Sequence, residues 1–246
     1  MAQLAHAARD TWSSKWAFIL AAAASAVGLG NLWRFPYLAA KYGGGMFLLT
    51  YLVLVFTFGL SLLLVEIALG RKTRQSTIGA FKMFGKKYAF IGILASLVPF
   101  IITPYYCVIG GWVAKYVGAY FFDPATMIGD GGTYFSSFIT SSFESYIWLF
   151  VFMAIVFFVV SRGIKGGIEK ANLIMMPALI IMTIILVVYT LSQPGALDGA
   201  AYYLVPDFSA FSIELVVAAL GQMFFSLSIA MGIMVTYGSY MKQRDS

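Results

Sequence analysis

The sequence is poor in charge, cysteine and histidine, and each shortage excludes a class of protein. Only 11% of the 246 residues are charged and 61% are hydrophobic, whereas a soluble domain carries roughly 25% charged residues. This composition indicates an integral membrane protein. The single cysteine, Cys107, excludes an intrachain disulfide, and a lone apolar-flanked cysteine is usually a packing residue. The single histidine, His6, comes near the N-terminus, and no pair of nucleophile and base is visible, so we expect no enzyme.

The long apolar runs predict six transmembrane helices. A spanning helix needs about 20 apolar residues, with a range of about 17–25, and six windows without any charged residue meet this length. The windows are residues 16–33, 42–65, 88–114, 145–161, 171–197 and 215–241. The N-terminal stretch "MAQLAHAARDTW" lacks the pattern of a cleavable signal peptide, so we expect none.

The positions of lysine and arginine predict the orientation. Thirteen of the sixteen basic residues fall in alternate loops on one side, and six of the acidic residues fall on the other. The positive-inside rule therefore places both termini in the cytoplasm and the chain, with several spans, in the inner (plasma) membrane. The net charge of +6 does not indicate nucleic-acid binding, because the basic residues lie in short loops without interleaved aromatic residues. We expect the lipid bilayer, and no nucleic acid, as a partner.

Two of the six windows contain residues that a simple spanning helix would avoid. The first carries "GLGN" and the sixth carries "GQMFFSLSIAMG". Irregular backbone at membrane depth survives only where it is buried in protein or lines a wet cavity, and there it offers carbonyl and N–H groups to a small cation or a zwitterion. Two structural alternatives stay open. The glycines could serve close helix packing, and Ser226 and Ser228 could bond to the preceding turn.

Several longer motifs resemble one family of membrane proteins. The string "SAVGLGNLWRFPYLAAKYGGGMFLLTY" resembles the first-helix signature of the neurotransmitter:sodium symporter family, which includes bacterial amino-acid transporters with the leucine-transporter fold. In chain order follow "VEIALGR", "PYYCVIGGW", "SRGIKGGIEKANLIMMP", "VPDF" and "GQMFFSLSIAMG". The resemblance implies an all-α membrane fold of two inverted five-helix repeats with discontinuous helices 1 and 6. It also implies sodium-coupled symport by alternating access.

The same resemblance implies that the chain is the N-terminal portion of a transporter. We expect one whole repeat, helices 1–5 at about 13–197, followed by helix 6 at about 213–241, with the C-terminal half missing. Helices 7 onward would come from the same gene or from another chain, and the six-helix piece alone is expected to be inactive. Two other classes stay open, namely a channel and an inactive membrane fragment or scaffold that retains the family motifs.

The family pattern implies that Na⁺ is the co-transported ion and that neutral oxygens bind it. One site would use the Ala26 carbonyl, the Asn31 side chain and the Ser226 hydroxyl. A second site would use the Ala24 and Val27 carbonyls, with its other ligands on helix 8. Several oxygen ligands suit a hard cation. Chloride dependence stays undecided, since residues that determine it lie partly on helix 7.

The resemblance also implies a substrate site beside the first sodium ion. Family members that carry monoamines have an acid at the position of Gly28, so glycine leaves room for the carboxylate of an amino acid. Tyr106 would bond to that carboxylate, or would simply pack between helices. Met231 is flexible and favours hydrophobic L-amino acids up to aromatic size. The predicted substrate-binding residues are Ala26, Gly28, Gly30, Ile102, Tyr106, Phe225, Ser226, Ser228 and Met231.

Further matched positions imply two gates. Arg34 would close the outer vestibule, where its acidic partner lies on helix 10. Arg9 and Trp12, in "RDTW", would form the inner gate near Ser239 and Tyr240. A simpler alternative for Arg9 is anchoring by the positive-inside rule.

Helices 2 and 5 carry residues for which the resemblance implies a structural role. Glu66 would be a hydrogen-bonded acid near the break in helix 6, or alternatively a side chain that reaches the membrane surface. Gly167 and Pro177 form Gly-x9-Pro, a helix-unwinding pair in some members of the family. Proline removes a helix hydrogen bond and glycine lowers the cost of unwinding.

Overall fold

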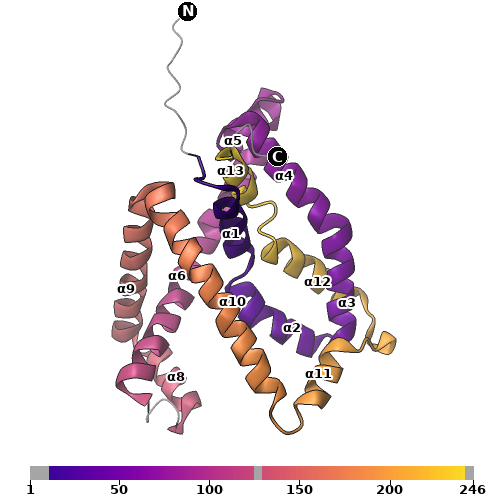
Figure 1. Cartoon of the computed structure of the whole chain (residues 1–246), viewed down its shortest axis with the longest axis vertical. Coiled ribbons are helices and arrows are strands. Elements are labelled where there is room, and N and C mark those ends of the chain that lie inside the picture. The colour runs from indigo at the N-terminus through magenta and orange to yellow at the C-terminus, as the bar shows by residue number, and fades with distance from the viewer. Residues whose placement is uncertain (1–10, 125–128, 242–246) are drawn as a thin grey trace, which may run out of the picture. The chain divides into compact units, whose positions relative to one another are not determined.

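The computed structural model describes residues 11–124 and 129–241, which form helices joined by short loops (Figure 1). The chain divides into two compact units. Unit 1 combines Met1–Ser96 with Glu169–Ser246, and unit 2 is Leu97–Ile168. Within the described residues, the only β-type pairing is an isolated bridge between Gly44 and Pro206. The predicted all-α fold is therefore confirmed.

Unit 1 contains both ends of the described chain. Its elements are α1 (Lys15–Ala26), η1 (Gly30–Arg34), α2 (Phe35–Lys41), α3 (Gly45–Leu54), η2 (Val55–Gly59), α4 (Leu60–Thr73), α5 (Thr77–Lys82), η3 (Lys86–Tyr88), α10 (Lys170–Leu191), α11 (Ala196–Leu204), η5 (Phe208–Ala210), α12 (Ile213–Ser226) and α13 (Ile233–Ser239). Helix α6 (Ala89–Phe122) begins in unit 1 and continues into unit 2. Unit 2 also contains α8 (Gly131–Thr140), α9 (Ser142–Ser161) and most of η4 (Ile164–Glu169).

The helices agree with the predicted spans. Four uninterrupted helical segments are long and apolar enough to cross a membrane, and a bent pair makes a fifth span. The four are Gly45–Thr73, Lys86–Phe122, Ser142–Ser161 and Ile164–Leu191, and the pair is Lys15–Ala26 with Gly30–Lys41, bent by 44°. The sixth predicted window falls on α12 and α13, which a break separates. The fifth predicted window extends too far, because its helix ends at Leu191 before the turn that contains Gly195 at φ +78°.

Side chains with oxygen atoms fix where several helices begin. The hydroxyl of Ser14 accepts a hydrogen bond from the Ala17 N–H at 3.1 Å at the start of α1. The hydroxyl of Ser212 does the same for the Leu215 N–H, at 3.1 Å, at the start of α12. Such caps satisfy N–H groups that have no partner inside the helix and contribute about 1 kcal/mol each. They fix the start of both helices that are later interrupted.

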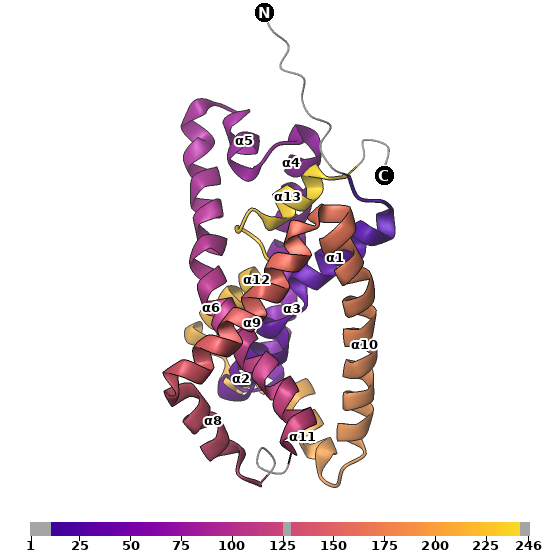
Figure 2. The ribbon, with the colours of Figure 1, turned by 90° about the vertical axis from the view of Figure 1, so that its left-hand side faces the viewer.

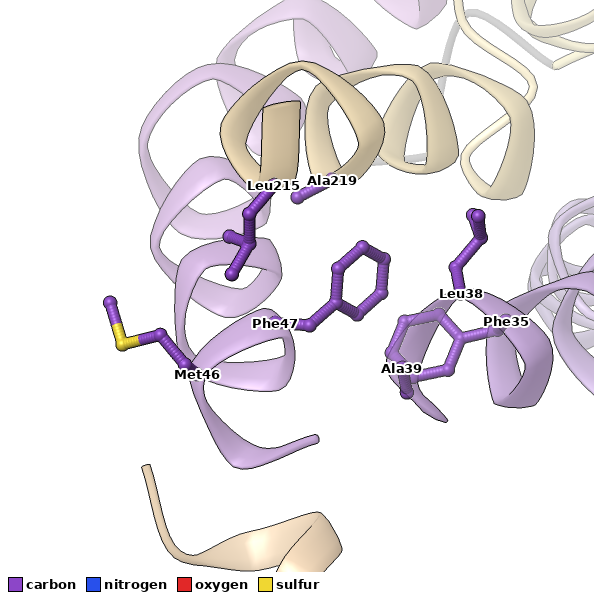
Figure 3. Close-up of a cluster of buried hydrophobic side chains, with 7 residues drawn as sticks. All are labelled: Phe35, Leu38, Ala39, Met46, Phe47, Leu215 and Ala219. Carbon is purple, nitrogen blue, oxygen red and sulfur yellow. The ribbon is translucent and has the colours of Figure 1, made fainter. Parts of the chain in front are cut away.

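A cluster of apolar side chains joins α2, α3 and α12. Figure 3 shows the ring of Phe47 between Leu215 and Ala219 of α12 and the ring of Phe35 of α2. The rings of Phe35 and Phe47 meet edge to face, with centroids 5.4 Å apart. Burial of one such side chain contributes about 1.5–3 kcal/mol. The cluster comprises Phe35, Leu38, Ala39, Met46, Phe47, Leu215 and Ala219. It holds the second half of helix 1 against helix 6.

Two glycines allow α4 and α13 to touch through their backbones. A Cβ atom added at Gly70 would meet the carbonyl oxygen of Val235, and one added at Gly238 would meet the carbonyl oxygen of Ile67. Figures 1 and 2 both show α13 beside the end of α4. Contacts between small residues are how membrane helices pack most closely. Gly70 and Gly238 are therefore the glycines through which α4 and α13 pack.

Candidate functional site

Helix 1 is interrupted where the sequence carries "GLGN". Helix α1 ends at Ala26, Val27 is extended (φ −103°, ψ 107°), and η1 begins at Gly30. The Gly28 carbonyl accepts hydrogen bonds from the N–H groups of Asn31 at 3.0 Å and Leu32 at 3.1 Å. The last carbonyls of a helix have no partner within it. The predicted ligands Ala24 and Ala26 lie in this last turn of α1.

Helix 6 is interrupted between Ser226 and Ile233, and the backbone there is strained. Three alternate residues have positive φ angles: Ser228 at +54°, Ala230 at +63° and Gly232 at +68°. A residue other than glycine in this region costs of order 1–3 kcal/mol and persists only where its surroundings hold it. The predicted discontinuity of helices 1 and 6 is confirmed.

Hydrogen bonds from α4 and α5 hold this strained segment. The Ala230 N–H donates to Glu66 Oε1 at 2.7 Å, which is the role that the sequence predicts for Glu66. The hydroxyl of Thr77 donates to the Gly232 carbonyl at 3.0 Å, and its side chain is buried. The alternative in which Glu66 reaches the membrane surface is wrong, because its carboxylate bonds to the broken helix. The polar groups that the break exposes thus find partners on neighbouring helices.

The two breaks are joined to each other by polar side chains. The Ser228 hydroxyl donates to the Ser25 carbonyl at 2.8 Å, and the Ser25 hydroxyl donates to Ser228 Oγ at 3.1 Å. Gln222 Nε2 donates to the Gly30 carbonyl at 3.1 Å and to Ser226 Oγ at 2.9 Å. Ser228 therefore does not bond back to its own helix, as one alternative held. Residues about 200 positions apart form one connected site.

Three buried side-chain oxygens beside the breaks have no hydrogen-bond partner among the described residues. They are Oδ1 of Asn31, Oε1 of Gln222 and Oε2 of Glu66, whose other carboxylate oxygen accepts from Ala230. A buried polar atom without a partner costs about 1–3 kcal/mol, so such an atom at membrane depth fits a cation ligand. Asn31 is a predicted sodium ligand, whereas Gln222 and Ser25 were not predicted. A single Gln in the middle of an apolar helix was the available signal, because polar residues inside a membrane are usually functional.

The two glycines of "GLGN" have different surroundings. A Cβ atom added at Gly28 would meet no heavy atom of the described residues within 4 Å, apart from its own chain neighbours. A Cβ atom at Gly30, in contrast, would lie 2.6 Å from Cδ1 of Phe225. The guanidinium carbon of Arg34 lies 5.3 Å from the centroid of the same Phe225 ring, within cation–π range. Arg34, predicted for the outer gate, and Phe225, predicted for the substrate site, are thus brought together.

The start of the described chain is fastened to the end of helix 6. Trp12 is 1% exposed. Its backbone N–H donates to the Tyr240 carbonyl at 3.0 Å, and its indole N–H donates to the Tyr237 carbonyl at 3.1 Å. Ser239, also predicted for the inner gate, is fully buried. Arg9 lies outside the described residues, so its role stays a prediction.

A second attachment at this end was not predicted. The carboxylate of Glu169 accepts hydrogen bonds from the backbone N–H and the hydroxyl of Ser13. Glu169 is only 4% exposed. It follows Gly167 in η4, and the segment Ile164–Leu191, which contains Pro177, is helical throughout. The predicted unwinding at Gly167 and Pro177 therefore stays a prediction.

Three predicted substrate-binding residues lie on α6 and in the irregular segment of helix 6. Ile102 and Tyr106 lie on α6, within unit 2. Met231 lies in the irregular segment of helix 6, next to Gly232. Their roles in binding a substrate stay predictions.

Comparison with known proteins supports the resemblance seen in the sequence. A family model described as the sodium:neurotransmitter symporter family matches residues 9–127 and 134–246. A sodium-dependent transporter of Methanocaldococcus jannaschii is 39% identical over 254 residues, which cover 96% of this chain and 50% of the relative. The human sodium- and chloride-dependent transporter XTRP3 is 28% identical, with 95% and 44% covered.

A solved structure shows the same fold. The crystal structure of MhsT in complex with L-phenylalanine is 37% identical, with a TM-score of 0.88, and the match covers 96% of this chain and 54% of that chain. The chain spans about half the length of the curated relatives it matches. The family match extends over nearly the whole sequence, and the solved structure shares the interrupted-helix architecture of the N-terminal half. The chain therefore belongs to the sodium:neurotransmitter symporter family.

Proposed function

We propose that this chain forms the ion- and substrate-binding half of a symporter that couples Na⁺ to uptake of hydrophobic L-amino acids. The observation that carries the proposal is the unpartnered Asn31 Oδ1, buried beside two interrupted helices. The helices that complete the relatives would supply the other half. The chain itself would contribute the first five-helix repeat and helix 6, with its N-terminus in the cytoplasm.

Neutral oxygens make the proposed sodium site suited to reversible binding. Asn31 Oδ1, the Ala26 carbonyl and Ser226 are dipoles, which bind a small cation well enough to enter and weakly enough to leave. Gln222 donates to Ser226 Oγ and so fixes its position. The carbonyls of Ala24 and Val27 would serve a second ion together with ligands from the missing half. Sodium bound at the first site would place a positive charge beside Gly28.

A free carboxylate fits that charge and the open space at Gly28. The relative MhsT was crystallised with L-phenylalanine, which supports an amino acid with an apolar side chain. Phe225 and Met231 would line the apolar part of the pocket, with Ile102 and Tyr106 from α6.

The carboxylate should distinguish substrates from their decarboxylated amines. We expect unlabelled L-tryptophan to displace radiolabelled L-leucine from the complete sodium-loaded transporter, and tryptamine to fail at a hundredfold higher concentration, since a charge-assisted contact is lost. A scintillation proximity assay measures this. Equal competition by tryptamine would show that no carboxylate is recognised, and failure of both would point to an inactive membrane scaffold.

Met231 should set the size limit of the pocket. Replacement Met231→Phe fills space with a stiff ring, so tryptophan should lose about tenfold in affinity relative to leucine, because a misfit in an apolar pocket costs about 1–3 kcal/mol. The sodium concentration for half-maximal binding should stay unchanged, since Met231 offers no oxygen. Equilibrium binding of both amino acids tests this. Met231 would be a packing residue if both affinities fell together.

A further inference from the structure

An apolar groove lies where α4 ends, beside α5 and the start of α6. Its volume is about 690 Å³. Seven of its eight lining residues are apolar or aromatic, and the eighth is Lys72. The lining comprises Val65, Ala68, Leu69, Lys72, Phe81, Phe84, Tyr88 and Ile91, all within unit 1. The groove is separate from the site between helices 1 and 6.

The groove is apolar at one end and cationic at the other. Lys72 occupies the last turn of α4, and Val65 lies seven residues earlier, about 10 Å deeper along the helix. On the returning helix, Ile91 likewise lies deeper than Lys87. The polarity of the groove therefore runs along the axis of α4, from an apolar end to a cationic end, as the polarity of a phospholipid runs from its acyl chains to its headgroup.

Aromatic residues of the loop are exposed beyond the end of the spanning helix. Phe84 is 58% exposed, and Met83 beside it is 63% exposed. Exposed apolar residues that adjoin a groove commonly mark a binding surface. Both residues follow the end of α4, so an acyl chain that covered them would extend beyond the end of this helix.

The charge around the groove is of one sign. Residues 71–88 contain six basic residues and no acidic residue. Four of the lysines are exposed: Lys72, Lys82, Lys86 and Lys87. No carboxylate in this stretch could pair with the amine of a zwitterionic headgroup, whereas a phosphodiester with net negative charge matches the lysines. Basic pockets of this kind, beside transmembrane helices, suit anionic lipid headgroups.

We propose that the groove is a binding site for one anionic diacyl phospholipid. One acyl chain lies along Val65, Leu69 and Ile91 and under Phe84, and the phosphate is held by Lys72 with Lys86 and Lys87. Helix α5, which carries Phe81 of the groove, also carries Thr77, whose hydroxyl donates to the Gly232 carbonyl of helix 6. The inference requires only that α4 spans the bilayer, so it does not depend on the proposed substrate or ion.

Native mass spectrometry of the purified chain, in detergent, tests the site. We expect phosphatidylglycerol to bind about tenfold more tightly than phosphatidylcholine with the same acyl chains. The variant Lys72→Gln/Lys82→Gln/Lys86→Gln/Lys87→Gln should abolish this preference, and Phe84→Ser should weaken binding of both lipids. The matched control Lys165→Gln/Lys170→Gln removes exposed basic residues from η4 and the start of α10 and should leave the preference intact.

A second measurement separates the lipid from other occupants. A photoreactive phosphatidylglycerol should label peptides within residues 61–91, both in this chain and in the full-length transporter. Labelling of the short chain only would show that another protein segment covers the groove, and it would overturn the proposal. Equal competition by glycerol 3-phosphate, which has no acyl chain, would show a simple phosphate site and would also overturn it.

Discussion

Replacement of Asn31 by alanine should raise the sodium concentration needed for amino-acid binding by about tenfold to a hundredfold. Asn31 Oδ1 is buried and has no hydrogen-bond partner among the described residues, so we expect a bound cation to stabilise it in the complete transporter. Loss of a partner for a charged group costs about 1.5–3 kcal/mol, and each 1.4 kcal/mol is a factor of about ten. Binding of labelled L-phenylalanine as a function of sodium concentration measures the change.

A matched control removes an oxygen elsewhere in the membrane. The Thr183 hydroxyl donates to the Leu179 carbonyl of its own helix at 2.8 Å, so Thr183→Ala should leave the sodium dependence unchanged. Ser226→Ala should also raise the sodium requirement, because it removes the hydroxyl predicted as a second side-chain ligand of the same site. If Asn31→Ala and Thr183→Ala behaved alike, the assignment of Asn31 to the sodium site would be wrong.

Replacement of Gly70 by alanine should destabilise the chain, although alanine is the better helix former. In a helix interior, Gly→Ala contributes about 1 kcal/mol of stability when the new methyl group is accommodated. At Gly70 the methyl group would collide with the Val235 carbonyl, and α4 and α13 would have to separate. Forcing extra atoms into close packing costs about 1–3 kcal/mol or more.

The same substitution at an open position provides the comparison. Gly199 lies inside α11, and an added Cβ atom would meet no heavy atom within 4 Å in the described chain. Thermal unfolding in detergent, followed by tryptophan fluorescence, should therefore show a lower midpoint for Gly70→Ala and a slightly higher one for Gly199→Ala. Two midpoints shifted upward together would disprove the backbone contact between α4 and α13.

Features that depend on a pattern within one segment, such as spans and helix breaks, could be predicted from the sequence. Windows without charge gave the spans, since a charge in hydrocarbon is costly. Gly28 and Gly30 marked the break in helix 1, and Glu66 was correctly associated with the break in helix 6 through the family motif. The end of the fifth span was misplaced, because the residues up to 197 are uncharged but Gly195 turns the chain.

Hydrogen bonds between residues far apart in the sequence could not be predicted from local patterns. The bridge from Gln222 to the Gly30 carbonyl requires two helices to meet, and nothing local to either residue specifies it. The left-handed conformation of Ala230 runs against its intrinsic preference, and only the hydrogen bond to Glu66 explains it. Ser13 and Glu169 are likewise ordinary polar residues until the fold brings them together.

Carbonyl groups at the end of α13 receive hydrogen bonds from Trp12, at the start of the described chain. The last turn of any helix presents carbonyls that its own backbone cannot satisfy, and here a residue 225 positions earlier in sequence supplies an N–H to Tyr237. Trp12 thus caps the end of α13 from a distant part of the same chain. Fraying of the end of α13 and release of Trp12 are therefore coupled, because each breaks the same two hydrogen bonds.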